Sequence, residues 1–188
     1  TQGIGRAAAQ ALASLGATCI LLSRNSESLQ AAVHTLDDRG GQEHRFLVAD
    51  FADRAALERV AEEIKNLKID ILVNNTGGPP AGPIVDAKED AFLAAFHQHL
   101  LANHLLASAV LPYMKQRGWG RIVNVVSTSV KIPLKGLGVS NTIRGAVASW
   151  SKTLSNEVAQ WGITVNNVLP GATATGRLSS IIENKAAK

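Results

Sequence analysis

The chain has 188 residues, of which 46% are hydrophobic and 18% are charged, and its formal net charge is +4. This composition fits one globular domain with a buried core and excludes a disordered or fibrous protein. Lys and Arg are scattered among acidic residues along the whole length, which argues against a nucleic-acid partner.

The single cysteine, Cys19, lies in the apolar run TCILL, where a thiol is expected to behave as a small buried side chain. One cysteine allows no disulfide within the chain, which favours a reducing, cytoplasmic setting. No apolar run approaches the roughly 20 residues of a membrane-spanning helix, and no charged-then-apolar leader opens the sequence. We therefore expect a soluble cytoplasmic protein with no membrane partner.

Helical and strand patterns alternate along the chain. Small and apolar residues over 3–15 predict a helix, and the apolar run over 17–23 predicts a strand. The same alternation of helix and strand continues over residues 26–39, 44–50, 54–66, 70–77, 89–117 and 121–127. Each strand is followed by a helix long enough to cross over and return parallel. The pattern predicts an α/β fold with a doubly wound parallel sheet, in three layers α/β/α.

Two segments have the composition of true loops. Residues 76–86 are rich in Gly and Pro, and residues 127–138 separate a predicted strand from a helix over about 140–160. Both lie just beyond the carboxyl ends of predicted strands, which is where open parallel sheets bind ligands. We expect the functional residues in these segments.

Gly3 and Gly5 stand at the start of the first helix. Such glycines let main-chain N–H groups approach a pyrophosphate at the positive end of a helix. Taken alone, the pair is equally consistent with a plain tight turn.

Four segments together resemble the short-chain dehydrogenase/reductase family. TQGIG (1–5) is similar to the end of the family's T-G-x-x-x-G-x-G turn, and LVNNTG (72–77) is similar to its N-N-A-G segment, with Thr76 in place of alanine. RIVNVVS (121–127) resembles the strand that carries the catalytic serine, and VNNVLPGATAT (165–175) resembles the N-x-[IV]-x-P-G-x-x-x-T segment. They occur in family order, and the nearest sub-family label is 3-oxoacyl thioester reductase-like.

The resemblance implies a Rossmann fold that these residues contain only in part. In the family a central strand precedes the Gly-rich turn, and a further strand and helices follow the P-G segment. We therefore expect residues 1–188 to be a single dinucleotide-binding domain that is incomplete at both ends, and the natural chain to be longer.

The resemblance also implies a nicotinamide cofactor. The second family strand ends here in Ser23 and Arg24 with no acidic residue, which favours NADP over NAD because arginine can bind a 2′-phosphate. Arg24 can also be read as an ordinary exposed residue. By the same resemblance Asp50 contacts adenine, Asn75 lines the ribose and Asn74 is structural. The expected cofactor-binding residues are Gly3, Ile4, Gly5, Ser23, Arg24, Asp50, Asn75, Thr76, Gly77, Pro170, Gly171, Thr173 and Thr175.

The family's catalytic tetrad is altered at three of its four positions. Ser127 matches the serine, whereas Ser140 stands at the tyrosine position, Arg144 at the lysine position and His99 at the asparagine position. An aliphatic hydroxyl is a far weaker acid than a phenol of pKa about 10, and a guanidinium of pKa above about 12 keeps its proton. The usual proton relay is therefore broken.

Two hypotheses follow. In the first, the protein is an NADP-dependent oxidoreductase that transfers a hydride between nicotinamide and a carbonyl or hydroxyl substrate, with a 3-oxoacyl thioester as one candidate. His99, or a water held by Ser140, would then supply the proton. In the second, it is an NADP-binding pseudoenzyme with a sensing or assembly role. His99 can equally be a hydrogen-bonded structural histidine.

Two further expectations concern metals and partners. His97, His99 and His104 do not have a recognisable metal-ligand spacing, so no metal is expected. The resemblance implies a homodimer or homotetramer formed through the helices over 89–117 and 140–160. Trp150 and Trp161 fit such an interface, and core packing explains them equally well.

Overall fold

The computed structural model describes residues 1–176, 178, 179, 182 and 183. The chain forms two compact units, which we call unit 1 (Thr1–Ala56 with Ala172–Lys188) and unit 2 (Leu57–Gly171). The expectation of a single domain over residues 1–188 stays a prediction.

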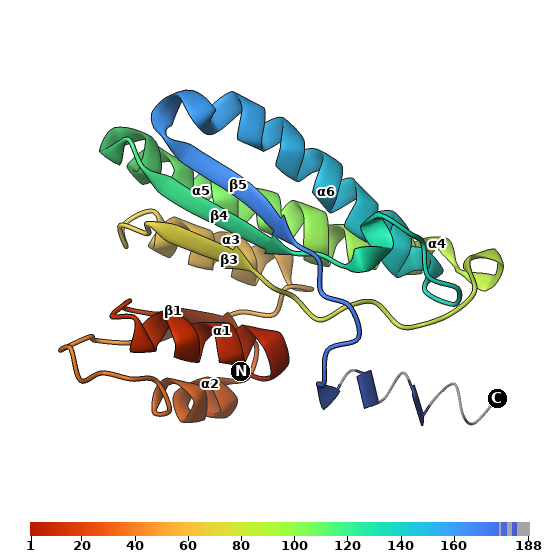
Figure 1. The fold of residues 1–188 in the computed structure, drawn as a ribbon, viewed down its shortest axis with the longest axis horizontal. Helices are drawn as coiled ribbons and strands as arrows, with labels where there is room; N and C mark the ends of the chain where they lie inside the picture. The colour runs from red at the N-terminus through yellow and green to blue at the C-terminus, as the bar shows by residue number, and fades with distance from the viewer. Residues whose placement is uncertain (177, 180–181, 184–188) are drawn as a thin grey trace. The chain divides into compact units, whose positions relative to one another are not determined.

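Unit 1 pairs two short parallel strands with two helices (Figure 1). Its elements are α1 (Gly3–Ser14), β1 (Ile20–Ser23), α2 (Ser26–Val33) and β2 (Arg45–Val48). In the strand register Ile20 lies opposite Arg45 and Ser23 lies opposite Val48. Helix α2 begins after Asn25, whose side chain accepts a hydrogen bond from the Ser28 amide at 2.7 Å, an N-cap that stabilises the first turn.

A small apolar cluster forms the core of unit 1. It consists of Ala9, Ala13, Cys19 and Leu36, with Leu12 and Leu21 packed against it. Ala9 and Ala13 are four residues apart and so share one face of α1. The Cys19 thiol is buried and donates to the Ala9 carbonyl at 3.6 Å, and burial raises its pKa. The expectation of a small buried side chain at Cys19 is confirmed.

Unit 2 contains a three-stranded parallel sheet with β4 in the middle. In chain order the elements are α3 (Arg54–Ile64), β3 (Ile71–Asn74), η1 (Ile84–Asp86), α4 (Glu89–Ala95), η2 (Phe96–Leu101), α5 (Ala102–Arg117), β4 (Gly120–Val125), η3 (Thr128–Val130), α6 (Gly138–Val158), η4 (Ala159–Trp161) and β5 (Ile163–Val168). Helix α3 begins in unit 1 and continues into unit 2. The register aligns Asn74 with Asn124, and Asn124 with Asn167, so three asparagines stand side by side across the sheet.

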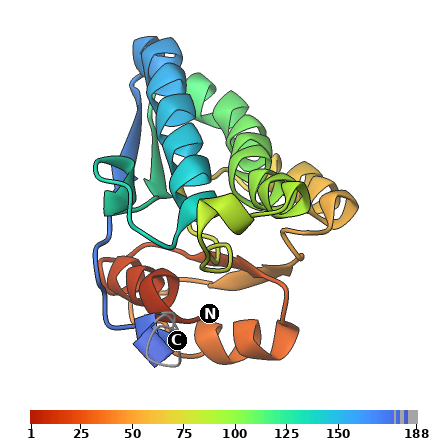
Figure 2. The same cartoon turned by 90° about the vertical axis from the view of Figure 1, so that its right-hand side faces the viewer.

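Helices cover one face of this sheet. Helix α5 contacts β3 and β4, helix α6 contacts β5, and Figure 2 shows α3, α5 and α6 on the same side of the strands. Fully buried side chains from strands and helices fill the layer between them: Val110, Met114, Ile122, Val147 and Ile163. This packing holds the carboxyl ends of β3 and β4 in fixed places, and the loops of interest leave from there.

The predicted α/β fold with parallel strands is confirmed, with three differences in detail. The described strands form two separate parallel sheets, β1–β2 in unit 1 and β3–β4–β5 in unit 2, and not the single sheet that was predicted. The helix expected over 26–39 ends at Val33, where the Thr35 hydroxyl donates to the Ala32 carbonyl at 2.7 Å and the last turn tightens. The helix expected over 89–117 is interrupted by η2, a π-helix.

The described residues contain neither a membrane-spanning helix nor a cluster of metal-binding side chains. No helix in the described part of the chain is both long and apolar enough to cross a membrane. Among the same residues no group of three or more His, Cys, Asp or Glu side chains is placed to hold a metal ion.

Candidate active site

The start of α1 has the form of an anion-binding turn. Gly3 has a φ of +53°, in the left-handed region, and a Cβ added there would lie 3.3 Å from Cγ2 of Thr175. The N-cap residue Gln2 makes no side-chain bond to the first turn, which contains no acidic residue. The amides of this turn, which include Ile4 and Gly5, therefore carry no side-chain cap, as a phosphate-binding helix start requires.

Three expected cofactor residues of unit 1 lie at the carboxyl ends of β1 and β2. Ser23 ends β1, and Arg24 follows it with a side chain that is 77% exposed. The Arg24 Nη1 atom lies 3.9 Å from Oδ2 of Asp50, and the other Asp50 oxygen accepts a hydrogen bond from the Ala52 amide at 2.9 Å. Asp50 thus holds Arg24 loosely and leaves most of its guanidinium in solvent, where a phosphate can reach it.

The P-G segment crosses from unit 2 into unit 1. In unit 2 the Pro170 carbonyl accepts a hydrogen bond from the Thr128 amide at 3.2 Å, and Gly171 lies next to the same threonine. In unit 1 the Thr175 hydroxyl donates to the Thr173 carbonyl at 3.2 Å. Thr175 also lies beside Gly3, and the assignment of both residues to a cofactor site stays a prediction.

A buried network of amides lies beneath the carboxyl ends of the unit 2 strands. Asn74 Nδ2 donates to Asn124 Oδ1 at 2.8 Å. Asn124 Nδ2 in turn donates to Ser151 Oγ at 3.1 Å and to Asn167 Oδ1 at 3.3 Å. Asn74 is 5% exposed, which supports the structural role expected for it. Sequence reasoning missed Asn124 and Ser151, although an asparagine inside the apolar strand RIVNVV was an available signal.

The loop after β3 begins with Asn75, Thr76 and Gly77. Among these residues Thr76 contacts His99. Its Oγ1 lies 2.5 Å from Nδ1 of His99, a hydrogen bond between the end of β3 and the π-helix η2. His99 is 1% exposed, and Asn103, four residues later, is 6% exposed on the same helical face. Sequence reasoning named both Thr76 and His99 but did not foresee that they meet.

Three further expected site residues, Ser127, Ser140 and Arg144, lie at the carboxyl end of β4 or on the first turns of α6. Ser127 follows this strand, and its Oγ accepts a hydrogen bond from the Ser129 amide at 3.1 Å. Arg144 Nη1 donates to the Val125 carbonyl at 2.7 Å, which ties α6 to the last residue of β4. Ser140 lies one turn earlier on α6 and is 8% exposed.

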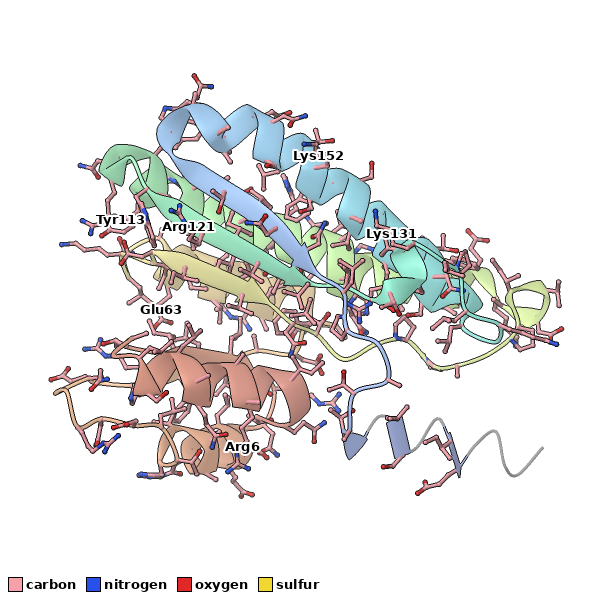
Figure 3. The ribbon with its side chains drawn as sticks, viewed as in Figure 1. Arg6, Glu63, Tyr113, Arg121, Lys131 and Lys152 are labelled. Carbon is pink, nitrogen blue, oxygen red and sulfur yellow. The ribbon has the colours of Figure 1, made fainter. Side chains whose placement is uncertain are left out.

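Tyr113 lies far from these positions within unit 2. Figure 3 shows Tyr113 with Arg121 near the amino-terminal end of the sheet, whereas Lys131, which follows η3, lies toward the opposite end. The one tyrosine of the chain therefore lies toward the opposite end of the sheet from Lys131.

The two loops at this end of unit 2 are joined to each other. The Gly82 amide donates to the Gly136 carbonyl at 2.8 Å, and the Gly138 amide donates to the Gly82 carbonyl at 3.1 Å. A Cβ at Gly138 would lie 2.5 Å from Cβ of Ile84, so only glycine fits at this crossing. Both loops line an open hollow of about 520 Å³, whose walls include Pro83, Leu134, Asn141 and Thr142. Sequence reasoning did not single out these residues.

The parallel strands, the glycine turn and the polar groups at the strand ends define a dinucleotide-binding type of α/β protein. The chain belongs to the short-chain dehydrogenase family, whose model matches residues 1–186, and it is an oxidoreductase of the short-chain dehydrogenase/reductase type.

Known proteins resemble the chain over most of its length. It is 33% identical to the 3-oxoacyl-[acyl-carrier-protein] reductase FabG of Haemophilus influenzae, over 100% of this chain and 76% of that protein. It is 35% identical to the inactive hydroxysteroid dehydrogenase-like protein 1 of Pongo abelii, over 93% of this chain and 54% of that protein. Among solved structures, L-sorbose reductase of Gluconobacter frateurii complexed with NADPH and L-sorbose matches with a TM-score of 0.90 and 28% identity, over 100% of this chain and 72% of that one.

Proposed function

We propose that this protein is an NADP-dependent oxidoreductase that transfers a hydride between nicotinamide and a carbonyl or hydroxyl carbon of a small molecule. The observation that carries the proposal is the gathering of Ser127, Ser140 and Arg144 around the carboxyl end of β4. Open parallel sheets bind their ligands at such strand ends.

NADP fits the groups present in unit 1. The uncapped amides of Gly3, Ile4 and Gly5 suit a pyrophosphate, and the exposed guanidinium of Arg24 suits a 2′-phosphate. The solved relative that holds NADPH adds support for this choice of cofactor. When bound, the reduced cofactor supplies the hydride. NAD is the alternative cofactor, and titration with NADPH and NADH distinguishes the two.

The chain's own residues polarise the substrate and supply a proton. The hydroxyls of Ser127 and Ser140 can donate hydrogen bonds to a carbonyl oxygen, and its negative charge grows as the hydride arrives. Arg144 contributes positive charge but keeps its proton, so it does not act as the acid. We assign the proton either to His99, whose imidazole can carry and release one, or to a water held by Ser140.

The substrate class to test first is a 3-oxoacyl thioester. This choice rests on the likeness to the Haemophilus influenzae reductase and on the open hollow at the loops, which is large enough for part of an acyl chain. Simple ketones serve as the comparison class.

The first experiment measures binding and turnover in the full-length protein. Calorimetric titration with NADPH and NADH gives the cofactor preference, and NADPH absorbance then follows reduction of 3-oxoacyl and simple ketone substrates. We expect Ser127→Ala to lower kcat about a hundredfold, as loss of an oxyanion donor does, and Arg144→Ala to lower it as well. Thr153→Ala, at an exposed position of the same helix, is the control.

The outcomes separate the two hypotheses. Substrate-dependent oxidation that falls in both variants supports the enzyme. NADPH binding without oxidation by the parent protein or either variant overturns it in favour of an NADP-binding pseudoenzyme with a sensing or assembly role. No binding of either nucleotide overturns both.

We also propose that the protein forms a homodimer or homotetramer through α5 and α6. Two tryptophans on or near these helices contact side chains of α5. Trp150 meets His104 in a T-shaped contact with centroids 6.3 Å apart, and Lys115 Nζ lies over the ring face of Trp161, 4.0 Å from its centroid. Such partly exposed aromatic groups are enriched at protein interfaces. Light scattering after size exclusion tests this proposal, and a monomer at micromolar concentration overturns it. The cytoplasmic location stays a prediction.

A further inference from the structure

Thr76 and His99 depart from the family pattern at two separate places in the sequence, and the fold brings the two departures into contact. Thr76 replaces the alanine of the N-N-A-G segment, and His99 stands where the family has its catalytic asparagine. Their Oγ1 and Nδ1 atoms lie 2.5 Å apart, although 23 residues separate them in the chain. Alanine at position 76 would offer no polar atom to this ring.

Because His99 is buried, its Nδ1 atom depends on Thr76 for a hydrogen bond. The side chain is 1% exposed, so its nitrogens cannot rely on bulk water for hydrogen bonds. A buried polar group without a partner is strongly unfavourable, whereas the Thr76 hydroxyl provides a partner for Nδ1. The two departures therefore act as one paired change.

The direction of the hydrogen bond follows from the chemistry of the two groups. A hydroxyl can donate one hydrogen, and within the described part of the chain His99 Nδ1 is the hydrogen-bond partner of Thr76 Oγ1. If Thr76 donates, Nδ1 is an acceptor, and the neutral ring then carries its hydrogen on Nε2. If Nδ1 donates instead, the hydroxyl hydrogen is left without a protein acceptor.

We propose that Thr76 is a positioning residue whose hydroxyl donates to Nδ1 of His99 and so fixes the ring as its Nε2–H tautomer. This inference rests on the proposed function and assigns the neutral His99 ring one role in it: its Nε2–H donates a hydrogen bond to the reacting oxygen, while the water held by Ser140 supplies the proton. It assigns Thr76 the task that other residues perform for catalytic histidines, which is to set the ring orientation and choose the nitrogen that carries the hydrogen. Thr76 thus acts through His99.

His99, one member of the pair, lies on a helix of unusual geometry. His99 belongs to the π-helix η2, and π-turns inside α-helices are frequent at functional sites. Thr76 stands two residues after the end of β3, whose last residue Asn74 is anchored in the buried amide network. Thr76 is therefore fixed by the sheet, and its hydrogen bond holds the His99 ring on the π-helix.

The test uses three variants and a spectroscopic readout that does not depend on activity. Thr76→Val removes the hydroxyl but keeps the shape, Thr76→Ser keeps the hydroxyl, and His99→Asn restores the family residue. Nitrogen-15 NMR of the imidazole rings at about pH 8 reports which nitrogen of the neutral ring carries the hydrogen. The His99 signals are assigned by their loss in His99→Asn.

We expect the parent protein and Thr76→Ser to show the Nε2–H tautomer of His99 and Thr76→Val to show a mixture of tautomers. An Nδ1–H tautomer in the parent, or the same tautomer in the parent and Thr76→Val, overturns the proposal. His97→Asn, at an exposed position in the same π-helix, controls for general effects on the helix.

The kinetic arm then separates positioning from binding. We expect Thr76→Val to lower kcat roughly tenfold with little change in the KM for NADPH, and Thr76→Ser to lose less. Adding Thr76→Val to His99→Asn should cause no further loss in kcat, since the positioned ring is already gone. An additive double variant overturns the proposal. If the parent does not turn over, the proposed function fails while the NMR arm still decides whether Thr76 sets the tautomer.

Discussion

The two units of the molecule treat their polar side chains differently. In unit 1 the charged pairs lie at the surface, as Arg24 with Asp50 and Arg39 with Asp37 show. Unit 2 also has surface ion pairs, such as Arg117 with Asp70, but a second set of its polar groups lies inside and bonds to one another, as in the Asn124 network and the Thr76–His99 contact. Water can replace a lost partner in unit 1 but cannot easily do so in unit 2. Single polar substitutions should therefore have very different consequences in the two units.

The largest effect is expected at the centre of the unit 2 network. Asn124→Leu removes the acceptor for Asn74 and the donor to Ser151, and it leaves buried polar atoms without partners. With about 1–3 kcal/mol for each stranded group, we expect the free energy of unfolding to fall by about 3 kcal/mol. Urea unfolding monitored by circular dichroism measures it. Asn166→Ala, on the exposed side of β5, should change it by less than about 0.5 kcal/mol. Equal losses of unfolding free energy in Asn124→Leu and Asn166→Ala would contradict the special importance of the buried network.

A smaller loss is expected where the two loops of unit 2 cross. Gly138→Val places a side chain 2.5 Å from Cβ of Ile84 and 2.6 Å from its Cα, and we expect a loss of about 2 kcal/mol from overpacking. Gly145→Ala is the matched control, because it lies on the same helix with no other atom within 4 Å of an added Cβ. It should stabilise the protein by about 0.5–1 kcal/mol. Thermal unfolding of both variants checks the opposite signs, and destabilisation by Gly145→Ala would show that the helix interior is more crowded than described.

The smallest effect is expected at the surface of unit 1. Hydrogen bonds from Arg39 lower the pKa of Asp37 from 3.8 to about 2. Because the folded pKa is depressed, the stabilisation is present above about pH 4 and is lost as the pH falls through about 2. NMR titration of the Asp37 carboxyl should give a midpoint near 2, and Arg39→Gln should return it toward 3.8. If the Asp37 midpoint is the same in the parent and in Arg39→Gln, Arg39 does not set the pKa of Asp37.

The fold could be predicted because it depends on patterns that are local in the sequence. Alternating helical and apolar segments predicted the parallel α/β arrangement, and the glycine turn predicted the form of the start of α1. The end of α2 at Val33 could not be predicted in this way, because a side-chain bond from Thr35 decides it. The π-helix at η2 also escaped prediction, since its residues have an ordinary helical pattern.

The sequence predicted a set of candidate site residues, which stay predictions, but it did not predict the contacts between them. The motif spacing named His99, Ser140 and Arg144 as departures from the family pattern. It could not indicate that Arg144 donates to the Val125 carbonyl or that Thr76 meets His99, because these contacts depend on how strands and helices pack. The spacing of residues along one chain contains no such information.

Two main-chain hydrogen bonds through Gly82 link the loop after β3 to the loop before α6. The linkage makes the two segments one mechanical part, so a force that displaces either loop is transmitted to the other. A bulky substrate that wedges into the hollow from the side of Pro83 would also shift the first turn of α6, where Ser140 lies. The size of a substrate in the hollow would then change the position of Ser140 without touching it.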